Sequence, residues 1–400
     1  MPKIKRIVVL CFWEFPIGMA PTNRILAYSK GFIENGVDVE IISFKRIYTD
    51  EVKLNNILSS GVVDGIHFEY PHFFNHLGRK LSIVRYYDEI ILRIKIIFKI
   101  FKLKSSNKID FVFFSFDDVF SLKAYTLLIK LLKIPIVFVA DEYPIPIRDF
   151  MQNLVPESLR IKYKKYHKQF KVRVLMSKAL ENFYNQNIHP LPSFLLNSIV
   201  NSKRFENINS ISSSNIICYM GNLSLSKDNV DNIIEAFSFI SDEYPDLELH
   251  LYGNPNENDK LILEELIRRL DIKQRVHFKG QVSSNLVPEI LCKSKILVNS
   301  QPITKRAEGG FPTKLAEYLM SEVPSIFTDS GDISLYLKDG VNGYMVEPCN
   351  SLLYSMKIKH ILNNYEEAKN VAVAGKKYIL ENFDSKKVTK ELIDFLEQHN

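Results

Sequence analysis

The sequence predicts two doubly wound α/β domains, each a parallel sheet covered by helices, with a deep cleft between them. The chain has 400 residues, which is too long for one typical core and suits two domains of roughly 200 residues. Short β-branched apolar runs alternate with segments of helical spacing over most of its length. An Asn- and Ser-rich stretch at 201–215 interrupts this alternation once, so the domains are expected at 1–205 and 206–383.

In the first half, an apolar run at 6–13 leads through a loop with Gly18 into a helical segment at 23–35 and a second buried run at 37–44. Strand, glycine loop, helix and strand in this order make a βαβ unit. Further strands are expected at 111–116, 134–140 and 172–176, and helices at 119–132 and from Lys178.

The same alternation restarts after residue 215. Strands are expected at 216–220, 247–252, 275–279, 296–299 and 323–328, and helices at 229–241, 257–270 and 285–292, with three helical stretches up to Asn400. Ligands of open parallel sheets bind at the carboxyl ends of the strands, near the point where strand order reverses. The sequence therefore predicts substrates bound at the strand ends, between the two domains.

The composition is that of an ordinary soluble globular chain, with 46% hydrophobic and 24% charged residues. A net charge of +6 is compatible with anionic partners but does not distinguish nucleotide sugars, lipids and nucleic acid. The aromatic residues are dispersed, which argues against a base-stacking surface and hence against nucleic acid. Four scattered cysteines form no C-x-x-C pair, and no signal peptide or membrane span is recognisable, so we expect a reduced, cytoplasmic protein.

The most informative stretch is EGGFPTKLAEYL at 308–319. Pro312 suits the first position of a helix, and Thr313 and Lys314 occupy its opening turn. Such a helix start offers unpaired N–H groups to a phosphate, and Glu317, one turn further, can accept hydrogen bonds from vicinal sugar hydroxyls. Phosphate and diol together predict a nucleotide site; the alternative is a glycine loop before an ordinary surface helix.

Two further pieces follow predicted strand ends. After 216–220, Gly221 lets the backbone approach a ligand, and Lys227 can neutralise a phosphate, although a lysine there can also be merely solvated. After 275–279, the chain leaves through Gly280 into a loop where the backbone at Val282 could pair with a flat base edge.

Taken in order, these pieces resemble the retaining GT-B glycosyltransferases of glycosyltransferase family four, which includes bacterial enzymes of polysaccharide assembly. The resemblance extends to the first half through FPIGMAPTNR at 15–24 and KGFIENGVDVEII at 30–42. It implies two Rossmann-like domains, an acceptor-binding one at 1–205 and a nucleotide-sugar-binding one at 206–383. The closing helix, at 384–400, is expected to pack back on the first domain.

The resemblance also implies residue roles. Lys227 would hold the donor diphosphate, Glu317 the ribose, the backbone at Lys314 and Leu315 the phosphates, Val282 the base, and Gly18 a phosphate from the opposite domain. The donor-binding set expected on this basis is Gly18, Asn222, Lys227, Val282, Gly310, Phe311, Pro312, Thr313, Lys314, Leu315 and Glu317.

Two positions depart from the family pattern. Asn222 stands where the family usually has an arginine, and Gly309 stands where it has the first of two glutamates, so donor sugar identity stays open. Lys305 and Arg306 are close enough in sequence to supply the missing positive charge, which we take as a hypothesis.

In glycosyl transfer the leaving nucleoside diphosphate gains negative charge, so lysines and fixed N–H dipoles stabilise the transition state. We expect Lys227 to be catalytic, with Asp117 and Asp141 contacting acceptor or sugar, and the resemblance implies retention of configuration and no metal cofactor. Asp117 could instead cap a helix, and Asp141 could lie in an exposed turn. Rival functions are an epimerase or phosphorylase on the same fold, and a catalytically silent sugar- or lipid-binding subunit.

The segment RKLSIVRYYDEIILRIKIIFKIFKLK at 79–104 combines an apolar face with many basic residues. This pattern is typical of a helix lying in the plane of a membrane, and many members of the family act on lipid-linked acceptors. The alternative is a core helix with snorkelling lysines. We therefore predict a cytoplasmic glycosyltransferase, peripheral to an anionic membrane surface, that adds a hexose-type sugar to a lipid-linked glycan.

Overall fold

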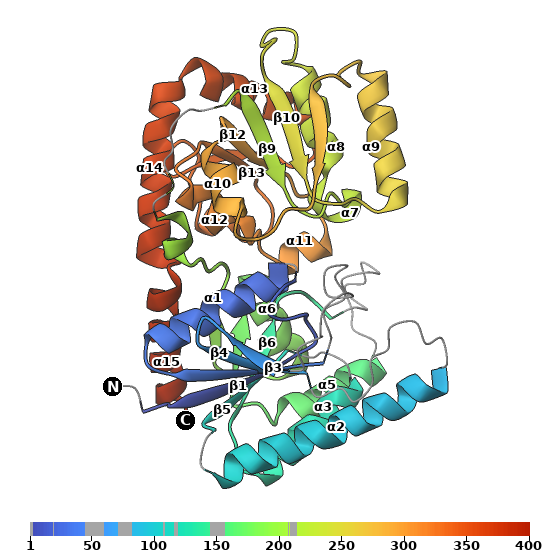
Figure 1. Ribbon diagram of the computed structural model, residues 1–400, viewed down its shortest axis with the longest axis vertical. Helices are drawn as coiled ribbons and strands as arrows, with labels where there is room; N and C mark the ends of the chain where they lie inside the picture. Colours follow the sequence, from blue (N-terminus) through green and yellow to red (C-terminus); the bar gives the residue numbers. More distant parts are fainter. Residues whose placement is uncertain are drawn as a thin grey trace. The chain divides into compact units, whose positions relative to one another are not determined.

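The computed structural model describes residues 3–18, 20–44, 60–70, 82–106, 109–115, 119–144, 157–206, 208 and 214–400. These residues form two compact units (Figure 1). The first consists of Met1–Asn201 together with Ser385–Asn400, and the second of Ser202–Asp384. The division falls within the polar segment where the alternation of apolar runs and helical spacing is interrupted.

The first unit contains an eight-stranded sheet in the order β3-β4-β2-β1-β5-β6-β7-β8. Its strands are β1 (Arg6–Cys11), β2 (Asp38–Ser43), β3 (Ser60–Val63), β4 (Ile66–Glu69), β5 (Phe111–Phe114), β6 (Ile136–Ala140), β7 (Val172–Leu175) and β8 (Ser193–Leu195). All adjacent strands pair in parallel except β3, which pairs antiparallel with β4. A tight turn with positive φ at Asp64 and Gly65 joins β3 and β4, which explains the exception.

The described helices of this unit are α1 (Ala20–Glu34), α2 (Ser82–Ser105), α3 (Val119–Leu131), α5 (Glu157–His167), α6 (Lys178–Phe183), a π-helix at Tyr184–Ile188 and α15 (Ser385–Gln398). No helix of the described residues is long and apolar enough to cross a bilayer.

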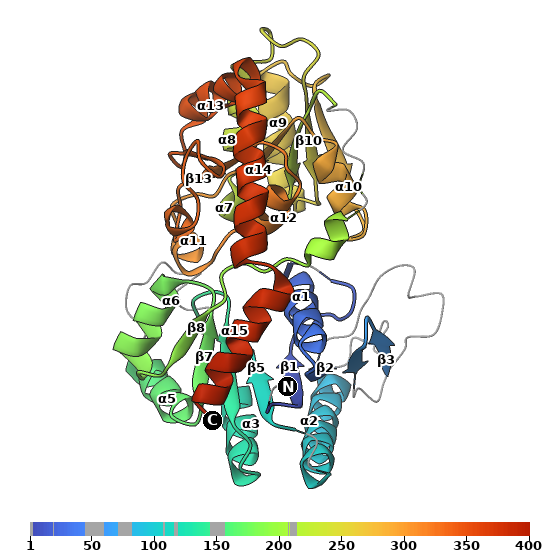
Figure 2. The same ribbon diagram turned by 90° about the vertical axis from the view of Figure 1, so that its left-hand side faces the viewer.

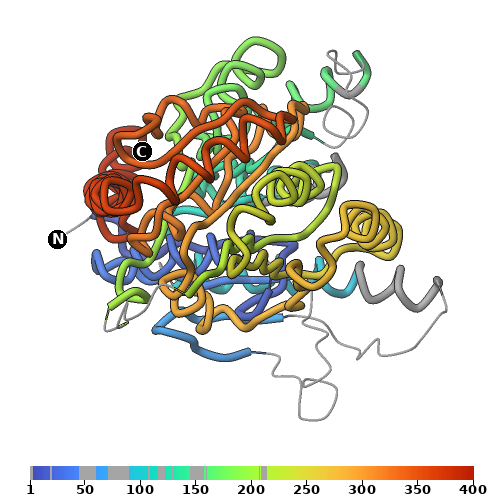
Figure 3. Tube along the Cα trace, turned by 90° about the horizontal axis from the view of Figure 1, so that it is seen from above, coloured from blue at the N-terminus to red at the C-terminus, as the bar shows by residue number. Residues whose placement is uncertain are grey.

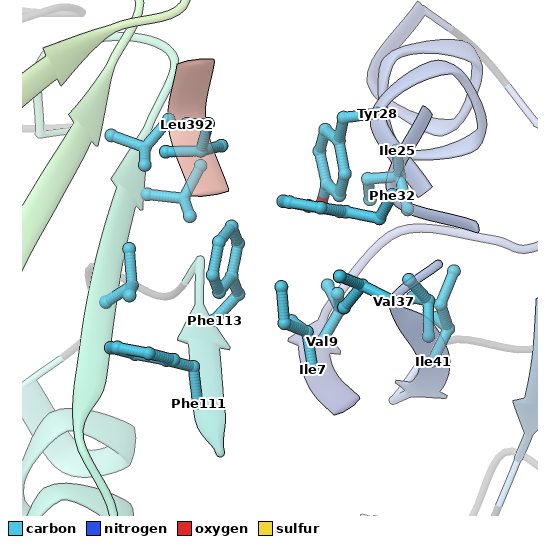
Figure 4. Close-up of a cluster of buried hydrophobic side chains, with 14 of the residues drawn as sticks. Ile7, Val9, Ile25, Tyr28, Phe32, Val37, Ile41, Phe111, Phe113 and Leu392 are labelled. Carbon is cyan, nitrogen blue, oxygen red and sulfur yellow. The ribbon is translucent and has the colours of Figure 1, made fainter. Parts of the chain in front are cut away.

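The core of the first unit lies where α1 and α15 cover the sheet. Phe32 of α1, Phe113 of β5 and Leu392 of α15 meet there, and all three side chains are buried (Figure 4). Helices α1 and α15 run side by side (Figure 2), and a Cβ atom at Gly31 would lie 2.3 Å from the carbonyl oxygen of Ser385. The last helix of the chain therefore completes the core of the first unit.

The second unit contains a six-stranded parallel sheet in the order β11-β10-β9-β12-β13-β14. Its strands are β9 (Ile216–Met220), β10 (Glu248–Tyr252), β11 (Val276–Gly280), β12 (Ile296–Asn299), β13 (Ser325–Thr328) and β14 (Tyr344–Val346). The chain builds this sheet outward from β9 in one direction and then from β12 in the other. Strand order thus reverses between β9 and β12, which is where open parallel sheets bind ligands.

The helices of the second unit are α7 (Leu225–Asp228), α8 (Val230–Ser238), α9 (Glu257–Arg269), α10 (Val287–Cys292), α11 (Lys305–Gly309), α12 (Lys314–Met320), α13 (Ser351–Asn363) and α14 (Tyr365–Asn382). Figure 3 shows α8 and α9, in yellow-green and yellow, running side by side. A 3₁₀ turn at Ser202–Phe205 precedes β9. Both units have the doubly wound α/β architecture that the sequence predicts.

Candidate nucleotide-sugar site

The candidate site in the second unit begins where β9, β10 and β11 end. The N–H group of Gly221 donates to the carbonyl of Tyr252 (2.9 Å), and that of Gly253 donates to the carbonyl of Gly280 (2.9 Å). Gly253 has φ of +130°, and a Cβ atom there would lie 1.8 Å from the carbonyl oxygen of Gly221. The three strand exits therefore pack backbone against backbone, and side chains are excluded from this contact.

Lys314, the first residue of α12, extends toward the end of β9. Its Nζ lies 3.1 Å from Oδ1 of Asp228 and 3.4 Å from the hydroxyl of Tyr219. A Cβ atom at Gly221 would lie 2.6 Å from the same Nζ, so the lysine passes directly beside this glycine. Figure 1 shows α7, which carries Asp228, at the same end of the sheet as α11 and α12.

Asp228 is almost fully buried, with a side chain that is 1% exposed. Burial alone would raise the pKa of its carboxyl, but the charges of Lys314 and Lys227 outweigh burial and hold the pKa below its ordinary value. The carboxylate is thus ionised at neutral pH. Lys314 pairs directly with this carboxylate and Lys227 acts on it through space, so positive groups gather at the end of β9, where a diphosphate could be bound.

Sequence reasoning missed Asp228. It directly follows Lys227, and an Asp–Lys neighbourhood in a loop after a strand is the usual composition of a solvated turn. Its role emerges only because Lys314, distant in sequence, lies against it.

Glu317 lies one turn into α12 with its side chain 23% exposed, and it already has a partner. Nη1 of Arg204 contacts its Oε1, while Nη2 of Arg204 donates to the carbonyl oxygen of Ser284 (2.5 Å). Arg204 belongs to the 3₁₀ turn before β9, inside the stretch where the sequence indicated only a linker.

The other residues expected to bind the donor differ in their exposure to solvent. Gly310, Phe311, Pro312 and Leu315 are buried, and the ring of Phe311 packs edge-on to Tyr336 at 5.4 Å between centroids. The N–H group of Leu315 donates to the carbonyl of Pro312 (2.9 Å).

The remaining members of the expected set are more accessible. Thr313, Lys227 and Val282 are partly exposed, and Asn222 is exposed. Val282 lies in the loop after β11, and Asn222 follows Gly221 directly.

The segment before α12 forms a separate short helix, α11, which the sequence did not indicate. Thr304 caps it by accepting a hydrogen bond from the N–H group of Ala307 (3.1 Å). Lys305, considered above as a replacement for the missing arginine, forms an ion pair with Glu308 (2.5 Å). Gly309, in place of the first family glutamate, is the buried last residue of this helix.

In the first unit, Gly18 packs closely against the start of α1. A Cβ atom there would lie 2.2 Å from Oγ1 of Thr22, which itself donates to the carbonyl of Glu14 (2.6 Å). Any side chain would therefore push the loop away from the helix.

Asp141 follows β6, and its Oδ1 lies 3.3 Å from Nε of Arg24. Arg24 is buried and also donates to the carbonyls of Leu196 and Asn197, so Asp141 serves as counter-ion to a fixed cation. Asp117 lies outside the described residues.

Within the described part of the chain, one group of side chains has the composition of a metal site: Glu248, His250 and His277. Oε2 of Glu248 lies 2.8 Å from Nε2 of His250 and 3.5 Å from Nε2 of His277. A hydrogen bond between His250 and the carboxylate accounts for the close approach of these two side chains. The three residues lie toward the starts of β10 and β11, away from the strand ends where Gly253 and Gly280 lie.

The comparisons with known proteins bear on the fold and on the second unit. Residues 201–378 match the family model described as glycosyl transferases group 1, so the second unit contains a domain of that group. A putative glycosyltransferase, EpsD of Bacillus subtilis (strain 168), is 24% identical over 179 residues, which are 45% of this chain and 44% of EpsD. The match thus spans less than half of that relative.

Solved structures extend the likeness to almost the whole chain. Sucrose-phosphate synthase from Thermosynechococcus elongatus superposes with a TM-score of 0.74 at 12% identity, over 98% of both chains. HepE from Anabaena, in a complex with UDP-glucose, gives 0.71 at 13% identity over 98% of this chain and 99% of its own. TarM gives 0.69 at 12% identity over 98% of both chains. At such identities the likeness establishes the fold, and the predicted GT-B class is confirmed.

Proposed function

We propose that the protein is a retaining glycosyltransferase of family four that moves a hexose-type sugar from a nucleotide sugar to a hydroxyl group of a glycan. The observation that carries this proposal is the ion pair between Lys314 and the buried Asp228, beside the glycine-lined end of β9. The group 1 domain at 201–378 supports it, as does the UDP-glucose held by HepE, a protein of the same fold.

The proposed chemistry follows from charge. When the bond between sugar and diphosphate breaks, the leaving nucleoside diphosphate becomes more negative, and groups that bind it more strongly in that state lower the barrier. Lys227 and Lys314 would supply that stabilisation, with Asp228 holding Lys314 in place. Because two lysines provide the positive charge, no metal cofactor is included in the proposal.

Recognition of the nucleoside would involve two parts of the second unit. Glu317 would accept hydrogen bonds from the ribose hydroxyls, and the loop around Val282 would contact the base. In the first unit, phosphate binding is proposed for Gly18, and acceptor contacts are proposed for Asp117 and Asp141. The ion pair between Asp141 and Arg24 favours such a binding role, because the buried guanidinium holds the carboxylate in a fixed position.

We also propose that α2 contacts an anionic membrane surface that holds a lipid-linked acceptor. Leu92, Ile96, Ile100 and Leu103 bury one face of α2 in the first unit. A second apolar row points outward, with Ile94 47%, Phe98 68% and Phe101 57% exposed. Lys102 and Lys104 lie beside this row, whereas Lys99 is held by Glu40 and Glu69 at 2.7 Å each. An exposed apolar row with flanking lysines suits the boundary between headgroups and acyl chains.

Co-sedimentation with vesicles tests the membrane proposal. Wild-type protein should bind vesicles containing anionic lipid at low salt, and F98S/F101S should lose most of that binding. L352S provides a matched control, because Leu352 is equally exposed but lies on α13 of the second unit. Failure of the wild-type protein to bind anionic vesicles would remove the membrane part of the proposal.

Nucleotide sugars test the central claim. A panel of UDP-, GDP- and ADP-sugars is screened for thermal stabilisation and for nucleoside diphosphate release with added glycan acceptors. E317Q should weaken donor binding roughly tenfold to 150-fold, since hydrogen bonds to a charged group contribute about 1.5–3 kcal/mol. E264Q, at an exposed glutamate paired with Lys260, should leave binding unchanged.

The rival functions give different results in the same experiment. An epimerase would convert the donor without an acceptor. A silent subunit, which Asn222 and Gly309 would favour, would bind sugar or lipid and transfer nothing. If no nucleotide sugar binds, the proposed function is wrong.

A further inference from the structure

Arg204 links two segments that are distant from it in sequence. Its guanidinium contacts Oε1 of Glu317 on α12 and donates to the carbonyl of Ser284 in the loop that follows β11. The proposed function assigns ribose contacts to Glu317 and base contacts to this same loop, at Val282. One side chain therefore joins the two parts of the proposed nucleoside site.

Contacts of the residues next to Arg204 hold its backbone in place. Oγ of Ser202 donates to Oδ2 of Asp384 (2.6 Å), and Phe205 is buried, so the backbone is fixed on both sides of Arg204. The side chains of Arg204 and Glu317 are only 26% and 23% exposed, so the solvent screens their interaction less than that of a surface pair. A charge-assisted hydrogen bond in such a place is short and directional.

Only one carboxylate oxygen of Glu317 is used. Among the described residues Oε2 receives no hydrogen bond, so it stays available to a ligand while Oε1 is bound to Arg204. The guanidinium also holds the carboxylate in a single orientation, which removes part of the entropy loss that a ligand would otherwise impose on Glu317.

We propose that Arg204 is a positioning residue for nucleoside recognition. It orients Glu317 toward the ribose and holds the loop at 281–286 against α12, so that ribose and base contacts are presented together. This inference rests on the proposed function. It adds a residue from the turn before β9 to a site otherwise built at the strand ends.

The test compares ligands that use different parts of the site. Calorimetry measures binding of UDP, GDP and ADP to the wild-type protein, and the tightest of these is then compared with its 2′-deoxy form and with inorganic pyrophosphate. R204A should bind the nucleoside diphosphate about tenfold more weakly, because charge-assisted hydrogen bonds to Glu317 and Ser284 are lost. Pyrophosphate binding should be unchanged, because pyrophosphate needs only the lysine end of the site.

The 2′-deoxy ligand reports on orientation. The wild-type protein should favour the ribonucleotide over the deoxynucleotide, and R204A should lose most of that preference because Glu317 is no longer oriented. The ribose preference of R204K should lie between those of the wild-type protein and R204A. An ammonium group keeps the charge but cannot form the two hydrogen bonds of the guanidinium. R268A is the matched control: it removes an exposed Arg–Glu pair on α9 and should change nothing.

The outcomes separate this inference from the function on which it rests. If no nucleoside diphosphate binds the wild-type protein, both fail. If nucleotides bind but R204A retains both affinity and ribose preference, only the positioning role is wrong. If R204A loses pyrophosphate and nucleotide binding equally, Arg204 has a general structural role. If R204A binds the nucleotide more tightly, Arg204 obstructs the site. Either result overturns the inference.

Discussion

Replacing Lys314 with methionine is expected to destabilise the second unit by about 3 kcal/mol at pH 7. Methionine keeps an unbranched side chain of similar length, so the substitution removes charge more than volume. What remains is the carboxylate of Asp228, 1% exposed, without its direct ion-pair partner. Removing one partner of a buried ion pair costs roughly 3–5 kcal/mol, and the nearby Lys227 places this case at the lower end.

The effect should depend on pH with a definite sign. In the wild-type protein the pKa of Asp228 is below its ordinary value of 3.8, so its stabilising charge is present above that pH and is lost as the pH falls through the folded-state pKa. In K314M burial dominates and raises the folded-state pKa above the unfolded one. The carboxyl then destabilises the variant increasingly as the pH rises above about 4. The difference in the free energy of unfolding between K314M and the wild-type protein should therefore be smaller at pH 4.5 than at pH 7.

Thermal unfolding of the full chain at the two pH values measures this deficit. For a unit of this size 1 kcal/mol corresponds to roughly 2–4 °C, so the transition of the second unit should fall by about 6–12 °C at pH 7. K314M/D228N should recover most of the loss because an amide can be buried neutral. K357M is the control, because Lys357 is 22% exposed and pairs with an exposed Asp339, an interaction worth about 1 kcal/mol or less. An unchanged melting temperature for K314M, or an equal deficit at both pH values, would refute the argument.

Three further outcomes follow from packing. L392A should destabilise the first unit by about 2–5 kcal/mol, since this fully buried side chain of α15 fills the core beside α1; an unchanged melting temperature would contradict that placement. G253A should lose stability and nucleotide binding, because its Cβ atom would collide with the carbonyl of Gly221, whereas G340A, where φ is also positive but the space is open, should have a much smaller effect. The exposed Cys349 should react with a thiol reagent in the native protein, while Cys11 and Cys218, whose pKa burial raises to about 12, should react only after unfolding.

The sequence predicted the regular elements of the second unit most closely. The strands at 216–220 and 296–299 have the predicted bounds, and in the first unit the closing helix expected at 384–400 spans Ser385–Gln398. Strands buried on both faces read as continuous apolar runs, and the closing helix has a clear amphipathic period, so local composition is sufficient in these cases.

The sequence did not reveal the hairpin of β3 and β4 or which face of α2 is buried. The hairpin of β3 and β4 consists of two strands of four residues, too short to stand out, although Asp64-Gly65 is a turn signal that could have indicated it. For α2 the apolar residues lie on more than one face. Its sequence therefore could not show that Leu92, Ile96, Ile100 and Leu103 would be buried while Phe98 and Phe101 stay exposed.

By itself the sequence determined the α/β class, the two-unit organisation, and the glycine and lysine positions at the strand ends. These depend on local periodicity and on residues that follow strands directly. The tertiary structure alone decided the electrostatic partners: Lys314 with Asp228, Glu317 with Arg204, and Asp141 with Arg24. Each pair joins residues far apart in the chain, and a charge acts through space over a few ångströms whatever the sequence separation. No local pattern could therefore have shown which carboxylate meets which cation.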